Sequence, residues 1–267
     1  MLSKLFKYEL KATGRIFLPL LLVLLLFAVI NKFTIGPDKF DAPAMISMAI
    51  YVFIMAGMFV MTFLMMIQRF HKNLLSDEGY LMLTLPVKPW KHIVSKLFVS
   101  MLWMAISGIA ALISILIIAL KKGDLTQFTV AFVNFYHRSF ELLGASVYLL
   151  SFEIIMVLLV SLASGILVIY ASIAIGHLFN QHKMLASFGA FIVLSALSKT
   201  LLALVSSLPG TDYYSNINIH ISSIQDLIVA RPVIQLVLAA GIIFTGLAGA
   251  AYFAITNYIL SKRLNLE

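Results

Sequence analysis

The sequence predicts an all-α integral membrane protein that crosses the bilayer six times. The first observation is composition: 62% of the 267 residues are hydrophobic, only 11% are charged, and the mean hydropathy is +1.04. A soluble domain carries about 25% charged residues, so this chain lacks the polar side chains needed to cover a water-facing surface. The second observation is a series of six apolar runs, each long enough to cross a hydrocarbon core about 30 Å thick.

The six runs define one predicted transmembrane domain over residues 1–267. A span needs about 20 apolar residues, and the runs cover approximately residues 16–33, 44–67, 97–120, 147–178, 184–206 and 233–260. The fourth and sixth are long, which indicates helices that tilt, kink or extend beyond the membrane. The first run ends in Asn31-Lys32-Phe33 without a small-residue cleavage pattern. We therefore expect a retained helix and not a cleaved signal peptide.

The distribution of basic residues predicts the orientation. If both termini are cytoplasmic, twelve of the 19 Lys and Arg residues lie inside and seven outside, which is the bias that the positive-inside rule requires. The segment 121–146 is the open point, because its aromatic stretch is interrupted by Asn134, His137, Arg138 and Glu141. We expect an outer interfacial helix or an extension of the fourth span. If this segment crossed instead, every later span would be inverted.

The N-terminal segment, residues 1–14, predicts an amphipathic helix on the inner membrane surface. Leu2, Leu5, Phe6 and Leu10 share one face, and Lys4, Lys7 and Lys11 share another. Basic amphipathic helices of this kind bind anionic lipid. The alternative is a simple extension of the first span.

Residues 69–96 form a polar, basic island between the second and third apolar runs. Ser76, Asp77 and Glu78 offer capping oxygens and negative charge at a helix start, and an apolar stretch beginning at Tyr80 follows. Such an element on the cytoplasmic side suits the groove of a soluble partner. The alternative is that it packs back on the ends of its own helices.

Two stretches, MLSKLFKYELKATGRIFLPL and RFHKNLLSDEGYLMLTLPVKPWKHIVSKL, resemble permease subunits of the ABC-2 type from Gram-positive bacteria. The layout of six spans with a long inner segment after the second span is similar as well. The resemblance implies a type V exporter fold with a coupling helix that docks on a separate ATPase subunit. That helix corresponds to residues 74–85, with the candidate coupling residues Leu74, Leu75, Ser76, Asp77, Glu78, Gly79, Tyr80 and Leu81. The inner turn Asn180-Gln181-His182-Lys183 would be a second, smaller contact.

The same resemblance implies the function and the partners. We expect the permease subunit of an ATP-driven exporter in the bacterial cell membrane, which moves hydrophobic or amphipathic cargo such as peptides, toxins or antibiotics. Two ATPase subunits would bind ATP and Mg²⁺, and a second permease copy or a paralogue would complete the path. The chain itself has no G-x-x-x-x-G-K-[ST] phosphate loop. We therefore expect ATP to be bound and split on a partner chain, with no enzyme activity and no cofactor on this one. No two histidines have i, i+4 spacing beside a carboxylate, so we expect no metal, and the basic residues follow the topology, so we expect no nucleic-acid partner.

Two ionisable residues lie within predicted spans, Glu153 in the fourth and Lys199 in the fifth. A charge at the bilayer centre costs at least about 2.5–3.5 kcal/mol, so such residues usually have a partner or a role. Both lie about seven residues, or roughly 10 Å, from the outer end of their span. We expect a Glu153–Lys199 ion pair, which would either lock the two helices together or line the cargo path; the remaining alternative is that the residues do not meet.

Rival functions make different demands on the sequence. An intramembrane enzyme needs several catalytic polar groups at one depth, and Glu153 with Lys199 is a sparse set. A secondary transporter driven by an ion gradient typically has internal repeats and broken helices, which the sequence does not display. The loop 207–232, with Pro209-Gly210, is expected on the outer side.

Overall fold

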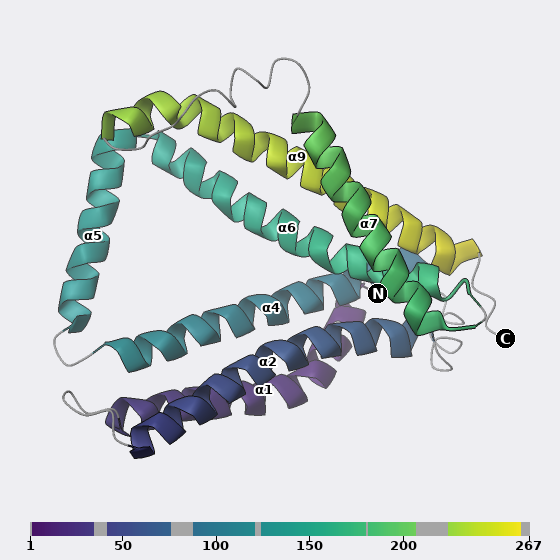
Figure 1. Cartoon of the computed structure of the whole chain (residues 1–267), viewed down its shortest axis with the longest axis horizontal. Helices are drawn as coiled ribbons and strands as arrows, with labels where there is room; N and C mark the ends of the chain where they lie inside the picture. The colour runs from purple at the N-terminus through teal and green to yellow at the C-terminus, as the bar shows by residue number, and fades with distance from the viewer. Residues whose placement is uncertain are drawn as a thin grey trace. The chain divides into compact units, whose positions relative to one another are not determined.

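The computed structural model describes residues 2–34, 42–75, 88–120, 124–179, 181–206 and 224–262. Within these ranges the chain is helical, and no strand occurs (Figure 1). The helices are α1 (Leu2–Thr34), α2 (Ala42–Leu75), α4 (Pro89–Ala119), α5 (Asp124–Leu143), α6 (Ser146–Gly176), α7 (Lys183–Ser206) and α9 (Ile224–Lys262).

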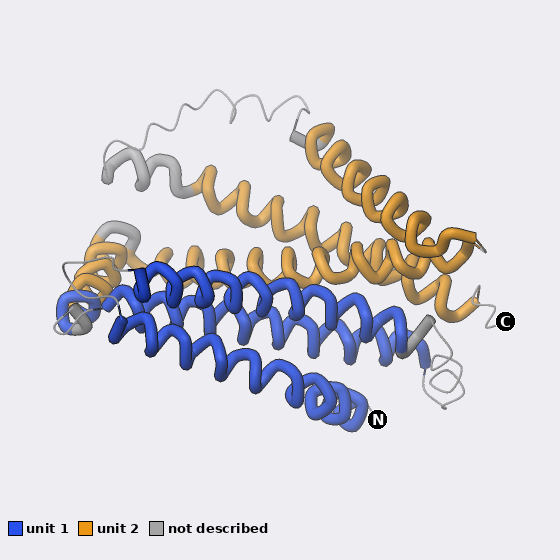
Figure 2. Tube along the Cα trace, turned by 60° about the horizontal axis from the view of Figure 1, so that its bottom comes forward, with its two compact units in different colours: residues 1–129, 266–267 blue, residues 130–265 orange. Residues whose placement is uncertain are grey.

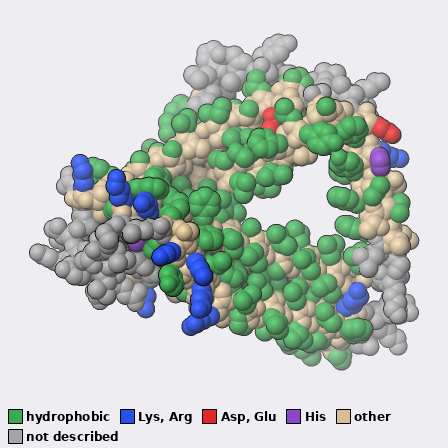
Figure 3. Space-filling model, turned by 180° about the vertical axis from the view of Figure 1, so that it is seen from behind, with side chains coloured by type: hydrophobic (Ala, Val, Ile, Leu, Met, Phe, Trp, Pro, Cys, Tyr) green, Lys and Arg blue, Asp and Glu red, His purple; other side chains and the backbone are tan. Residues whose placement is uncertain are grey.

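All six predicted spans are confirmed as helices that are long and apolar enough to cross a membrane. These are Leu2–Thr34, Ala42–Lys72, Pro89–Ala119, Ser146–Gly176, Lys183–Leu204 and Pro232–Lys262. Their outward faces are apolar, and hydrophobic side chains cover most of the described surface seen in Figure 3. Water would penalise this surface, whereas lipid tails solvate it. The chain is therefore an all-α, multi-pass membrane protein.

The helices cluster into two compact units (Figure 2). Unit 1 contains residues 1–129 and 266–267, with α1, α2 and α4, and unit 2 contains residues 130–265, with α6, α7 and α9. In unit 1 the three long helices pack against one another. Their shared core consists of Phe17, Leu21, Leu24, Ala28, Tyr51, Met58, Met65, Val99, Trp103, Ala110 and Ala111.

In unit 2, α6 packs against both α9 and α7. The buried residues of α6 gather in its second half, from Ser164 to Gly176. Small residues allow the helices to approach closely there: a Cβ added to Gly249 on α9 would lie 3.4 Å from Ser164 Cβ. Gly176, at the end of α6, is closer still to α7, since an added Cβ would lie 2.6 Å from the backbone nitrogen of Ser187.

The backbone explains two of the helix ends. Lys88 is extended, with φ −62° and ψ 139°, and Pro89 begins α4, because proline disfavours a helical residue before it and suits the first helical position. Gly144 ends α5 with a φ of +55°, and its N–H donates to the Phe140 carbonyl oxygen at 2.8 Å. This left-handed glycine is a common helix terminator.

The backbone shows how the N-terminal segment and the segment before the fourth span are built. Residues 2–14 are continuous with the first span in α1, with no helix end near residue 14. Their placement on a membrane surface remains a prediction. Residues 124–143 form their own helix, α5, and not an extension of the fourth span, because Gly144 separates α5 from α6. α5 is also not among the helices long and apolar enough to span.

Candidate functional site

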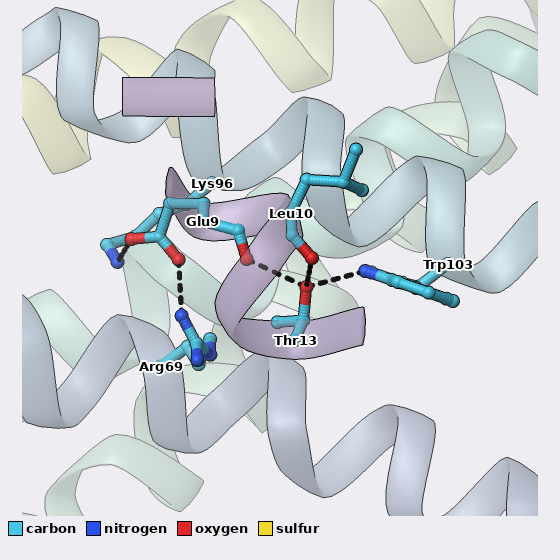
Figure 4. A network of polar contacts seen from close by, with 6 residues as sticks. All are labelled: Glu9, Leu10, Thr13, Arg69, Lys96 and Trp103. Atoms are coloured by element: carbon cyan, nitrogen blue, oxygen red, sulfur yellow. Dashed lines mark hydrogen bonds and ion pairs between the residues drawn. The ribbon is translucent and has the colours of Figure 1, made fainter. Parts of the chain in front are cut away.

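The main polar site of unit 1 is a buried carboxylate held by two cations, here called the Glu9 cluster: Glu9, Arg69 and Lys96 (Figure 4). Lys96 Nζ donates to Glu9 Oε1 at 2.6 Å, and Arg69 Nη1 donates to Glu9 Oε2 at 2.7 Å. Glu9, Arg69 and Lys96 come from α1, α2 and α4, respectively. Each carboxylate oxygen therefore joins α1 to a different neighbouring helix.

Burial differs within the Glu9 cluster. The side chains of Lys96 and Glu9 are 3% and 9% exposed, whereas that of Arg69 is 23% exposed. Removing a charge from water is costly unless an opposite charge and hydrogen bonds compensate. Lys96 is therefore the cation more fully removed from water, while part of the Arg69 side chain reaches the surface.

A second polar contact lies one helical turn further along α1. Thr13 Oγ1 donates to the Glu9 carbonyl oxygen at 2.8 Å and accepts from Trp103 Nε1 at 2.7 Å. The Trp103 ring stacks on Phe17, with ring centroids 4.5 Å apart and planes inclined by 13°. The indole is thus fixed by both its polar edge and its apolar face, as buried tryptophans usually are.

A small cavity adjoins both contacts. Its volume is about 20 Å³, and its lining includes Glu9, Thr13, Arg69, Lys96 and Trp103. A single water molecule needs about 10–15 Å³ by this measure, so the cavity has room for roughly one. The site is therefore a set of buried polar contacts between helices, and its cavity is too small to hold a substrate.

Two further polar atoms on α4 are buried beside the cluster. His92 and Ser95 are 2% and 3% exposed, and His92 Nε2 and Ser95 Oγ have no hydrogen-bond partner within the described ranges. Deeper in unit 1, Asn31 bonds to Ser47 and Tyr51 bonds to Ser114, both at 2.7 Å. Polar contacts therefore join these three helices at several levels.

The Glu9 cluster was not predicted from the sequence, although a signal was present. The buried residues of α1 include Glu9, Thr13, Phe17, Leu21, Leu24, Ala28 and Asn31, which recur at three- and four-residue intervals. Glu9 begins this otherwise mostly apolar stripe. A carboxylate in such a position requires cationic partners, and the polar island supplies both of them at its first and last residues, Arg69 and Lys96.

The predicted interfacial residues differ in exposure. Lys4, Lys7 and Lys11 are exposed, and Leu5 and Phe6 are half-buried. Phe6 packs against the core of unit 1. The apolar face of the segment is therefore partly occupied by the protein itself.

The structure does not bring Glu153 and Lys199 together in an ion pair. Lys199 is exposed, and Glu153 Oε2 is buried without a hydrogen-bond partner in the described part of the chain. Both Figures 1 and 2 show α7 diverging from α6 with distance from the turn that joins them. The prediction paired the two residues because they lie at the same distance from the outer ends of their spans. That distance determines neither the inclination of α7 nor the direction in which each side chain points.

The predicted coupling residues lie largely outside the described ranges. Leu74 and Leu75 are the last residues of α2, whereas Ser76, Asp77, Glu78, Gly79, Tyr80 and Leu81 fall in residues 76–87, which are not described. The second predicted ATPase contact is the turn 180–183, and Asn180 in this turn also lies outside the described ranges. His182 has a left-handed φ of 56°, and its carbonyl oxygen accepts from Ala186 N–H at 3.0 Å as α7 begins.

In the described residues, no group of three or more His, Asp or Glu side chains is placed to hold a metal ion. No protein-family model, no curated protein and no solved structure matches the chain.

Proposed function

We propose that this chain is the permease subunit of an ATP-driven exporter of the ABC-2 type. In this proposal it moves hydrophobic or amphipathic cargo out across the bacterial cell membrane, with both termini in the cytoplasm. Two ATPase subunits bind ATP and Mg²⁺, and a second permease copy or a paralogue completes the path. Six spans, the polar island and the sequence resemblance support this assignment.

One observation carries the proposal furthest: the first and last residues of the polar island, Arg69 and Lys96, bind the same buried carboxylate. The island is thereby anchored at its base to α1 as well as to α2 and α4. A partner that pushes on residues 74–85 would displace three helices together. An element that converts the movement of a soluble ATPase into movement of spans needs such an anchor.

The proposal is tested by co-purification of the tagged chain with the ATPase encoded beside it. The test variant changes Asp77, Glu78 and Tyr80 to Ala. The matched control changes Asp212, Tyr213 and Tyr214 to Ala, because it removes a similar acidic and aromatic set from the predicted outer loop. We expect recovery of the ATPase to fall in the first variant alone. Equal recovery with all three proteins, or no associated ATPase, contradicts the proposal.

Glu153 favours one alternative, a secondary transporter driven by an ion gradient. Intramembrane carboxylates mark ion pathways and proton relays in carriers, and Glu153 Oε2 has no hydrogen-bond partner among the described residues. Export measured in cells or vesicles separates the two mechanisms. Export by the ATP-driven complex stops when ATP is depleted and survives collapse of the proton and sodium gradients. The opposite pattern assigns the chain to the gradient-driven class.

A further inference from the structure

The six candidate spans contain two acidic side chains, Glu9 and Glu153, which differ in their polar partners. Glu9 is bound by Lys96 and Arg69 at 2.6 and 2.7 Å. Glu153, on α6 in unit 2, has a buried Oε2 without a hydrogen-bond partner in the described ranges. The Glu9 carboxylate thus has a cation on each oxygen, whereas Glu153 is half-buried and its Oε2 has no hydrogen-bond partner among the described residues.

No described cation of unit 2 compensates Glu153. Lys199, the basic residue within the neighbouring span, is exposed on α7, and the ion pairs found among described residues both belong to Glu9. An uncompensated charge in the hydrocarbon region costs at least about 2.5–3.5 kcal/mol. A ligand that brings a positive charge to this carboxylate would recover part of that cost.

The surroundings of Glu153 define the rest of such a ligand. Leu149, one helical turn away on the same side of α6, is 49% exposed, and the adjacent Phe152 and Ile154 are 63% and 51% exposed. Side chains four residues apart are neighbours on a helix surface. Glu153 itself is half-buried, so the exposed part of its side chain lies among apolar neighbours. This setting suits a hydrophobic body that carries one cationic group.

We propose that Glu153 is a binding site for lipophilic or amphipathic cations, and that the cargo of this chain belongs to that chemical class. The carboxylate attracts the positive charge in a medium of low dielectric constant, where charge–charge attraction is stronger than in water. The flanking apolar side chains hold the hydrophobic body. The assignment of cargo rests on the proposed export function, whereas the binding site itself does not.

The probes are tetraphenylphosphonium and tetraphenylborate, which have nearly the same size and shape and opposite charge. Binding is measured by equilibrium dialysis to the full chain in nanodiscs of zwitterionic lipid, with empty nanodiscs as the baseline for partition into lipid. The variants are Glu153→Gln, which keeps the shape and removes the charge, and Glu153→Asp, which keeps the charge. Lys199→Gln is the matched control, because it also replaces a charge by an amide in unit 2.

We expect Glu153→Gln to weaken tetraphenylphosphonium binding at least about tenfold, a factor equivalent to about 1.4 kcal/mol. Glu153→Asp and Lys199→Gln retain binding within a few-fold, and no variant gains or loses tetraphenylborate in the same proportion. Equal binding of the cation by the native chain and Glu153→Gln overturns the proposal, as does an equal loss in Lys199→Gln. Since no ATPase takes part, failure here is distinct from failure of the co-purification test.

Discussion

Lys96 and Glu9 form an ion pair of 2.6 Å between side chains that are 3% and 9% exposed, although 87 residues separate them in the chain. Arg69 occupies the other carboxylate oxygen. Because Arg69 and Lys96 are the ends of the polar island, the N-terminal helix holds the base of the segment that we propose to bind an ATPase. Glu9 therefore links α1 to both α2 and α4 at that end of unit 1.

Replacing Glu9 by Gln is expected to destabilise the chain strongly. The change removes the carboxylate charge that Lys96 and Arg69 share, and breaking a buried pair in this way typically costs about 3–5 kcal/mol. Thermal unfolding of the detergent-solubilised chain, followed by circular dichroism, measures the loss. Glu141→Gln on α5 is the control, since Glu141 is exposed. A midpoint for Glu9→Gln as high as that of the control contradicts the role assigned to Glu9.

The two cations should differ in their coupling to Glu9. Lys96 is almost fully buried and Arg69 is 23% exposed, so we expect Lys96→Gln to cost more stability than Arg69→Gln. The double variant Glu9→Gln with Lys96→Gln removes both charges of the pair, so neither charge is left buried without the other. Its loss should therefore be smaller than the sum of the single losses, by about 0.5–3 kcal/mol. Strict additivity of the two changes contradicts a direct Glu9–Lys96 interaction.

The hydrogen bond between Trp103 and Thr13 makes a further prediction. Thr13→Val keeps the side-chain shape and leaves the indole N–H of Trp103 without its acceptor, and a buried unsatisfied donor costs about 1–3 kcal/mol. Trp103→Phe removes the donor and keeps a ring against Phe17. We expect the double variant to be no less stable than Trp103→Phe alone. If Thr13→Val lowers stability equally in both backgrounds, the contact does not contribute as described.

The six spans followed from the sequence because they depend on a local property. A helix in hydrocarbon satisfies its own backbone and needs only a continuous apolar run, and every predicted run corresponds to a candidate span. The structure extends the first run, predicted as residues 16–33, back to Leu2. Charged side chains near the end of a span do not interrupt the helix. Hydropathy alone therefore underestimates the length of the helix.

The polar partners did not follow from the sequence, for two physical reasons. Glu9 meets Arg69 and Lys96 across 60 and 87 residues, and the packing of three helices decides such contacts. Glu153 and Lys199 were paired by their depth along two spans. Each residue also advances about 100° around its helix axis, and the inclination of α7 separates the spans, so equal depth does not place two side chains in contact.

Gly176 provides a test of the close approach between α6 and α7. A Cβ at this position would lie 2.7 Å from Ser187 Cα and overlap the Ser187 hydroxyl oxygen, so Gly176→Ala forces the two helix ends apart. Overpacking of this kind costs about 1–3 kcal/mol. Gly165→Ala is the matched control in the same helix, because its Cβ would meet nothing within 4 Å, and alanine favours a helix by up to about 1 kcal/mol. We expect the unfolding midpoint to fall for Gly176→Ala and to stay or rise for Gly165→Ala. Equal midpoints for the two variants would mean that the ends of α6 and α7 are not in contact.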